Sequence, residues 1–599
     1  MRLVRARLAL AGCATFAFAT FAPSTRATEW RVGAESDCAA HTIQDAVDLA
    51  AGSGDDDKII SLTTDLDYSD ESVHIQNLDI TIEGGPVHCS SAFGGDPPVV
   101  SGSSGPVFDI GGTSHVTFHR LEIRDGNALT GGGINFAGNG TLTLDQTVVD
   151  FNHATWGGGI NAAASGAPID IYLNSGTQIL RNTADNSGGG IELSGQIALY
   201  ALQPHTLIAF NSAPGGTGGG IDTVGQVTVT LGSPGESGIP LIFFNSAQWG
   251  GGIAISGDGN VDHPGLLYMF TMDPDNPVAV SDNFATVAGG GIYLKTLTDS
   301  NVPTAWMCAQ DFRIDENVAP EGAALYLGWD TIAFSVDIGS VAQLNPEGSC
   351  DIEALGAVRC DANVPCNEMS GNVTQTPNGD PANGAIAVIG TSSELLADRT
   401  VMQSNIAESL IKTVGDNDGG VLTLRLSNCL TGENQFSREM IHLQNDDNLV
   451  EIDQCTFAPD IINSTHVIKF DNSGGNSLAL TDSIVDEPGT LTLSTPDAID
   501  LEVHYVLTND DSTLPNDGTV VLGTPEYVDG ANFDYHLLPA SPGVDFAPAA
   551  GGIDLDGKPR DIDLVVKPNL FGPRDLGAYE VQNICYHVDT VFCDGFDGS

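Results

Sequence analysis

The chain has 599 residues, of which 78 are acidic and 21 basic, and its formal net charge at pH 7 is −57. Hydrophobic residues make up 41% of the chain and charged residues 17%, a balance too apolar for a disordered acidic chain and sufficient for a large core. Such a negative charge argues against nucleic acid and anionic membranes as partners, because both attract clustered Lys and Arg.

The first 27 residues have the three parts of a secretory signal peptide. Three Arg residues precede an apolar stretch over 8–22, and Thr25-Arg26-Ala27 offers small recognition residues, so we expect cleavage after Ala27. Leu10-Ala11-Gly12-Cys13 also resembles a bacterial lipobox, which makes a lipid on Cys13 the alternative. No later stretch approaches the ~18 apolar residues of a membrane helix. The pattern therefore predicts an exported chain without a transmembrane segment.

The clearest short helix is expected over 42–50. Thr42 can cap it. One face is apolar and consists of Ile43, Ala46, Val47 and Ala50. Strands are expected over 59–62 and 80–82. We interpret 28–115 as an N-terminal cap followed by the first coils of a repeat structure.

An internal repeat organises residues 116–490. The segment Gly-Gly-Gly-Ile recurs at steps of 26 to 39 residues, ending at Ile134, Ile160, Ile191, Ile221, Ile253 and Ile292. An aliphatic residue, two variable residues and an Asn precede nearly every copy. These Asn residues are Asn152, Asn182, Asn211, Asn245, Asn283, Asn317 and Asn372. A period of this length indicates a solenoid, a propeller or an array.

Short alternating segments such as 141–144 and 227–231 lie between the turns and are typical of strands. Helical periodicity is nearly absent. The pattern predicts an all-β fold, a right-handed parallel β-helix solenoid with an N-terminal capping helix. We expect the Asn to occupy a turn with left-handed geometry and to stack on its neighbours, the Gly triplet to form a bend, and the Ile to point inward.

Two regions depart from the repeat. Residues 341–383 contain three Cys and several Pro and are interpreted as an inserted loop. Residues 491–599 are expected to contain the last coils and a C-terminal segment.

The sequence predicts a monomer.

Ten Cys remain after removal of residues 1–27, an even number that favours disulfides in an exported protein. The expected pairs are Cys38–Cys89, Cys308–Cys350, Cys360–Cys366, Cys429–Cys455 and Cys585–Cys593. Metal binding is the alternative, but no C-x-x-C occurs and no His stands at ligand spacing from a Cys pair.

Trp156 and Trp249 occupy the same repeat position, immediately before the Gly triplet. Aromatic side chains on an extended surface can stack on sugar rings, so both are candidate carbohydrate-binding residues. The alternative is that each packs over the Gly residues of its own turn and fills the space that they leave.

No catalytic, metal or cofactor site emerges from the motifs. The acidic run over 415–420 reads as a solvated turn. The runs 55–57 and 554–557 offer loose calcium binding at most, because the later ligands of an EF-hand are missing. No H-E-x-x-H, G-x-S-x-G or P-loop occurs.

Three resemblances follow from these features. The helix lid "TIQDAV" and the strand "ITIEGG" resemble the entrance of pectin-lyase-like right-handed β-helices, and the Asn and Gly-Gly-Gly-Ile repeat is similar to that of chlamydial polymorphic outer-membrane proteins. Near the C-terminus stand 534–537, 541–545, 556–560 and 575–580, whose order resembles the choice-of-anchor Q region of bacterial exported β-helix proteins.

The resemblances imply an exported bacterial protein, from a Gram-negative cell, that is secreted or held at the surface. We expect a structural, adhesive or carbohydrate-binding role, with an extracellular polysaccharide or a cell-surface glycan as partner. The alternative is a polysaccharide lyase or glycoside hydrolase whose site is assembled across coils.

Overall fold

A computed structural model describes residues 28–582 except 204, 233–240, 261–263, 271–276, 298–303, 329–330, 336–340, 345–349, 354–366, 377–378, 380–381, 390–392, 415–420, 473, 497–498, 516 and 566. The predicted signal peptide with Cys13, the acidic run over 415–420 and the Cys residues at 360, 366, 585 and 593 lie outside the described residues.

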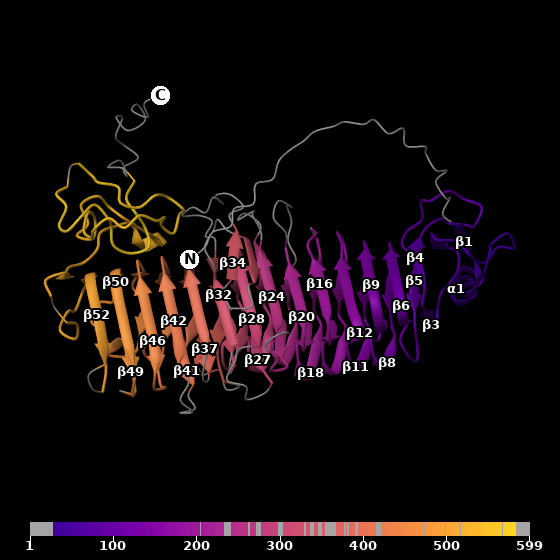
Figure 1. Cartoon of the computed structure of the whole chain (residues 1–599), viewed down its shortest axis with the longest axis horizontal. Helices are drawn as coiled ribbons and strands as arrows, with labels where there is room; N and C mark the ends of the chain where they lie inside the picture. The colour runs from indigo at the N-terminus through magenta and orange to yellow at the C-terminus, as the bar shows by residue number, and fades with distance from the viewer. Residues whose placement is uncertain are drawn as a thin grey trace, which may run out of the picture.

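The chain forms a long parallel β-helix, as the sequence predicts (Figure 1). One coil runs through β15 (Ile191–Ser194), β16 (Ile197–Ala201), β17 (Leu207–Ala209) and β18 (Ser212–Thr217). The next coil repeats this path in β19 (Ile221–Val224), β20 (Val227–Leu231), β21 (Leu241–Phe243) and β22 (Ser246–Trp249). Each strand pairs in parallel with its counterpart one coil away, so residues at equal repeat positions lie side by side.

Four rows of strands result. In the described chain the first three rows belong to one sheet of 40 strands, and the fourth forms a separate sheet of 11. The first row runs through β3 (Val73–Gln76), β6 (Phe108–His119), β9 (Ile134–Asp145), β12 (Ile160–Leu173), β15, β19, β23 (Ile253–Gly257), β27 (Ile292–Thr296), β31 (Leu325–Leu327), β37 (Gly384–Ile389), β41 (Ser409–Val414), β45 (Ile441–Leu443), β49 (His466–Phe470) and β51 (Leu491–Ser494).

The second row begins with β1 (Thr28–Val32), β2 (Lys58–Leu62) and β4 (Asp79–Gly84) and ends with β52 (Asp500–Thr508), and the third runs from β5 (Val99–Ser101) to β53 (Val520–Leu522). The 11-stranded sheet consists of β8 (Asn127–Thr130), β11 (His153–Trp156), β14 (Thr183–Ser187), β18, β22, β26 (Phe284–Ala288), β30 (Val318–Ala319), β36 (Val373–Thr374), β40 (Ile406–Ala407), β44 (Gln435–Phe436) and β48 (Ile461–Ile462).

The predicted helix and its apolar face are confirmed. Helix α1 (Ile43–Gly52) is capped by Thr42, whose side chain accepts a hydrogen bond from the Asp45 backbone N–H. Its buried residues are Ile43, Ala46, Val47 and Ala50. They join the core that the inward-facing aliphatic residues of the coils form, so the helix lies at the N-terminal end of the rod (Figure 1).

The recurring Asn residues form a buried ladder, as expected for their stacking. Asn182 Nδ2 donates to Asn211 Oδ1 at 3.1 Å, and Asn211 Nδ2 donates to Asn245 Oδ1 at 3.0 Å. The expected left-handed conformation, however, belongs to the residue before the Asn, such as Phe210 with φ of 58°. The reason is that the Asn itself must turn inward, where its amide satisfies backbone groups of the neighbouring coils.

The Gly triplet allows adjacent coils to approach closely. The first Gly has a positive φ, as in Gly218 with 64°, which non-Gly residues adopt at a cost. At the second position a Cβ on Gly219 would lie 2.3 Å from the Gly251 carbonyl oxygen in the next coil. The turn therefore requires Gly for both reasons.

The cysteine predictions are confirmed in part. Cys38 and Cys89 form a disulfide with a Cα–Cα distance of 5.3 Å, and Cys308 is disulfide-bonded. The expected Cys429–Cys455 pair is wrong, because both thiols are free and buried. Each donates instead to a backbone carbonyl, Cys429 to Ala397 and Cys455 to Asp453, both at 3.3 Å.

We expect Cys429 and Cys455 to resist iodoacetamide in the folded protein and to react after unfolding, because both thiols are fully buried and burial raises the pKa of the Cys455 thiol. Peptide mass mapping without reduction measures the labelling. A peptide pair joined through these two residues would contradict the prediction.

The predicted insertion over 341–383 contains an antiparallel hairpin of β33 (Val341–Leu344) and β34 (Cys350–Glu353). Within the same range, β35 (Asn367–Glu368) and β36 already pair with strands of neighbouring coils.

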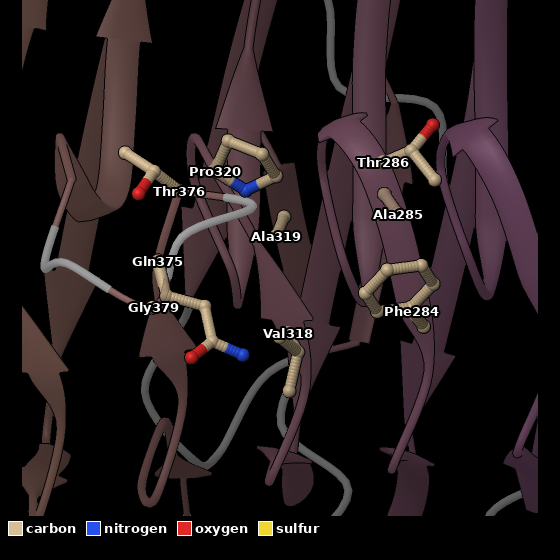
Figure 2. A pocket seen from close by; sticks show the side chains of 9 residues that line it. All are labelled: Phe284, Ala285, Thr286, Val318, Ala319, Pro320, Gln375, Thr376 and Gly379. Carbon is tan, nitrogen blue, oxygen red and sulfur yellow. The ribbon is translucent and has the colours of Figure 1, made fainter.

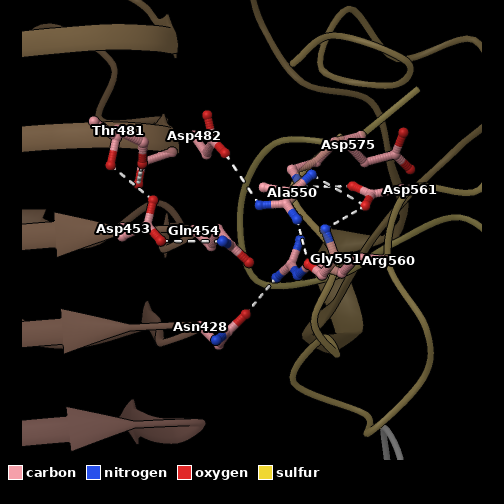
Figure 3. A network of polar contacts seen from close by, with 12 residues as sticks. Asn428, Asp453, Gln454, Thr481, Asp482, Ala550, Gly551, Arg560, Asp561 and Asp575 are labelled. Carbon is pink, nitrogen blue, oxygen red and sulfur yellow. Dashed lines mark hydrogen bonds and ion pairs between the residues drawn. The ribbon is translucent and has the colours of Figure 1, made fainter. Parts of the chain in front are cut away.

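The C-terminal segment lies against the side of the last coils (Figure 1). It contains β54 (Tyr527–Asp529) and β55 (Asp534–Leu537), which pair in antiparallel fashion. Its Arg560 donates to Asn428 Oδ1 at 2.7 Å (Figure 3), and Arg574 Nη1 lies 3.4 Å from an Asp482 carboxylate oxygen. Arg399 of the coils donates to the Leu555 carbonyl oxygen at 3.0 Å.

These contacts involve one turn of successive coils. Arg399, Asn428, Gln454 and Asp482 all have left-handed backbone conformations at this turn. Acidic residues of the predicted C-terminal motifs hold the segment together by accepting backbone N–H groups: Asp575 accepts from Asp545 and from Val581, both at 2.7 Å. The motifs over 541–545 and 575–580 therefore contribute internal structure to this segment.

Candidate functional site

The two predicted tryptophans lie in one row of the 11-stranded sheet. Trp156 on β11 pairs with Ser187 on β14, and Trp249 on β22 pairs with Thr217 on β18. Strands β14 and β18 are neighbours, so three strand-to-strand steps separate the tryptophans. At about 4.8 Å a step, this corresponds to roughly 14 Å along the rod.

The surroundings of the two tryptophans differ. Trp156 is 38% exposed. Trp249 is partly buried and packs against a small cluster of Ala254, Ala288 and Tyr293. The rings of Tyr293 and Tyr326 stack on adjacent coils with centroids 5.1 Å apart. Trp156 thus leaves over a third of its surface accessible, whereas Trp249 packs at the edge of an aromatic cluster.

A pocket opens on the same sheet, beginning one strand beyond Trp249. It has a volume of about 320 Å³ and is lined by residues of β26, of β30 and of the segment that directly follows β36. Figure 2 shows Phe284 and Gln375 on opposite sides of it. The lining is mostly apolar, with the polar side chains of Thr286, Gln375 and Thr376. An apolar hollow with a few polar groups is the usual character of a ligand site.

A pair of carboxyl groups stands at the bend beside this sheet, and the sequence interpretation missed it. Glu192 and Asp222 each follow the Ile of a Gly-Gly-Gly-Ile segment and pair across β15 and β19. Their exposed fractions are 8% and 1%. An acidic residue directly after the Ile in two consecutive Gly-Gly-Gly-Ile copies is the sequence signal that identifies this pair.

Burial controls the chemistry of the pair. It raises the pKa of Asp222 to about 7, and burial together with the nearby charge of Asp222 raises the pKa of Glu192 well above its usual range. Glu192 Oε2 and Asp222 Oδ1 are shielded from solvent and have no hydrogen-bond partner among the described residues, so burial favours the protonated, uncharged form of these carboxyls. Within the described chain neither carboxyl forms an ion pair with Lys, Arg or His.

The row of strand positions that contains Glu192 and Asp222 carries different types of side chain along the rod. After Glu192 and Asp222 come the aromatic residues Tyr293 and Tyr326, and further on Lys412 and His442. Lys412 Nζ lies 2.9 Å from a Glu408 oxygen, and His442 Nε2 lies 2.9 Å from an Asp471 oxygen. The row beside the 11-stranded sheet therefore holds two acidic residues at one part, two tyrosines in the middle, and a Lys and a His beyond them, and of these Glu192, Asp222, Tyr293, Lys412 and His442 are buried.

The two acidic runs that were expected to offer loose calcium binding have different surroundings. Asp55, Asp56 and Asp57 are exposed. Asp554 is buried and accepts from the backbone N–H groups of Lys558 and Glu580 at 2.7 and 3.0 Å. The Asp554 carboxylate is thus occupied by hydrogen bonds from the backbone of its own segment.

No family model matches the sequence, and no curated protein shows significant sequence similarity to it. No helix among the described residues is long and apolar enough to cross a membrane.

Proposed function

We propose that this protein is an exported β-helix rod without catalytic activity that binds an extracellular polysaccharide on the 11-stranded sheet. The observation that supports it best is the alignment of Trp156, Trp249 and the pocket along one face. The resemblances to pectin-lyase-like β-helices and to the choice-of-anchor Q region support export to the surface of a Gram-negative cell.

The spacing of this face suits an extended polymer. Because each coil advances by about 4.8 Å, the face offers a regular series of positions parallel to the rod. An aromatic ring can stack on the apolar face of a sugar, and the polar residues around the pocket, Gln375 and Thr376, can bond to hydroxyl groups. Several weak contacts in line then add to a useful affinity.

The test uses purified residues 28–599 on immobilised pectin, alginate, xylan and glycosaminoglycans. We expect retention on one glycan, and we expect Trp156→Ala to weaken it about 5- to 10-fold, or roughly 1–1.4 kcal/mol. Phe210→Ala is the matched control, since Phe210 is 52% exposed but lies on a turn outside this sheet. Equal losses in both variants, or no retention on any glycan, would argue against the proposal.

The second candidate is a polysaccharide lyase or glycoside hydrolase, and the Glu192–Asp222 pair is the observation that favours it. Raised carboxyl pKa values are common at catalytic sites. However, the two carboxyls of a glycosidase flank the scissile bond of a bound sugar, whereas Glu192 and Asp222 are buried, with exposed fractions of 8% and 1%. New reducing ends or unsaturated products from the same glycans, abolished by Asp222→Asn, would establish the enzyme instead.

A further inference from the structure

A group of three metal-ligating side chains lies at the N-terminal end of the rod, outside the 11-stranded sheet. Glu35, Asp65 and His88 each present one donor atom, and the three atoms lie within 4.8 Å of one another. They come from three segments: the loop between β1 and α1, the turn after β2 and the loop after β4. We propose that these residues bind one zinc-like divalent cation, which fastens the N-terminal cap to the first coils.

The distances fit tetrahedral coordination. Zinc bonds to imidazole nitrogen and carboxylate oxygen are about 2.0–2.2 Å long, so two ligand atoms of a tetrahedron lie roughly 3.3–3.5 Å apart. His88 Nδ1 lies 3.0 Å from Asp65 Oδ2 and 3.4 Å from Glu35 Oε1. Small adjustments are enough to place a cation between them, with a fourth position left for water.

The site is held in place before any cation binds. The Cys38–Cys89 disulfide joins the segment of Glu35 to the segment of His88. Thr63 Oγ1 donates to Asp65 Oδ1 at 2.5 Å, which leaves Oδ2 directed at His88. Such outer contacts orient metal ligands and strengthen binding.

The negative charge of the carboxylates around His88 also favours a bound cation. Glu35 and Asp65 each place a carboxylate oxygen within 3.4 Å of His88 Nδ1, so two negative charges face a single imidazole ring. Among the described residues, Glu35 Oε2 is shielded from solvent and has no hydrogen-bond partner. A desolvated carboxylate oxygen without a partner is unfavourable, and a divalent cation removes that cost more completely than one proton does.

The test is calorimetric titration of ZnCl₂ into chelator-treated residues 28–599 with the disulfides intact. We expect one zinc per chain with a Kd of about 1 µM or tighter, and at least about a tenfold weakening in His88→Ala and in Asp65→Asn. His74→Ala is the matched control, because His74 is exposed and contacts a single carboxylate, Asp109, at 3.2 Å. Thermal midpoints in EDTA show whether each variant folds.

Cobalt gives an independent readout of geometry. Co²⁺ at this site should show the intense visible absorption of tetrahedral coordination, and Asp65→Asn should remove it. The absence of zinc binding, an unchanged affinity in His88→Ala and Asp65→Asn, or a weak octahedral cobalt spectrum would each overturn the proposal.

Discussion

Replacing Gly219 with Ala is expected to destabilise the protein by about 4 kcal/mol or more, among the largest effects of a single substitution. The added Cβ would lie 2.3 Å from the Gly251 carbonyl oxygen and 2.6 Å from the backbone N and O of Ser246. These are backbone atoms of the next coil, whose spacing is fixed by hydrogen bonds on both sides. The clash therefore cannot be relieved by rotating a side chain.

The denaturant midpoint measured by far-UV circular dichroism quantifies the loss, and hydrogen exchange localises it to the coils around Gly219. Gly54→Ala is the control, because a Cβ there meets nothing within 4 Å. If both variants unfold at the same denaturant concentration, the close approach of the coils at the Gly triplet is not a source of stability.

The stability of the protein is expected to fall as the pH rises from about 4 to about 7, by on the order of 3 kcal/mol from the Glu192–Asp222 pair. In the unfolded chain both carboxyls lose their protons near pH 4. In the folded chain burial raises the pKa of Asp222 to about 7 and holds the pKa of Glu192 well above its usual range. The unfolded state thus binds fewer protons over this range, so each rise in pH favours unfolding.

The double variant Glu192→Gln, Asp222→Asn should remove this pH dependence and be more stable than the parent at pH 8, with little difference at pH 4. The preceding coils show why amides suit the row: Asn161 Nδ2 already donates to Asn135 Oδ1 at 3.0 Å. Asp500→Asn, Glu502→Gln on β52 is the control, because it removes the same charge from exposed positions. An equal gain in the control would attribute the effect to net charge alone.

The sequence was sufficient to predict the β-helix, because Asn, Gly and Ile keep a fixed phase and each has a physical role in the turn. It placed Trp156 and Trp249 in one row for the same reason. The left-handed position was assigned one residue too late, since Phe210 and Arg181 are not residues that favour this conformation.

The other sites depend on contacts that no repeat encodes. Glu35, Asp65 and His88 lie in three loops outside the repeat, and only the folded cap brings them together. Arg560 reaches a residue 132 positions earlier. The 320 Å³ pocket depends on small residues such as Ala285 and Ala319 beside a segment that breaks the repeat. Spacing within one sequence does not specify such contacts.

The attachment of the C-terminal segment changes how the far end of the rod comes apart. A bare solenoid loses its terminal coil first, because that coil has only one neighbour. Here Arg399, Asn428 and Asp482, from different coils, are all bonded to one segment. A force that pulls on the C-terminal segment is therefore shared among several coils at once. The coils can separate one by one only after the contacts between them and this segment have broken.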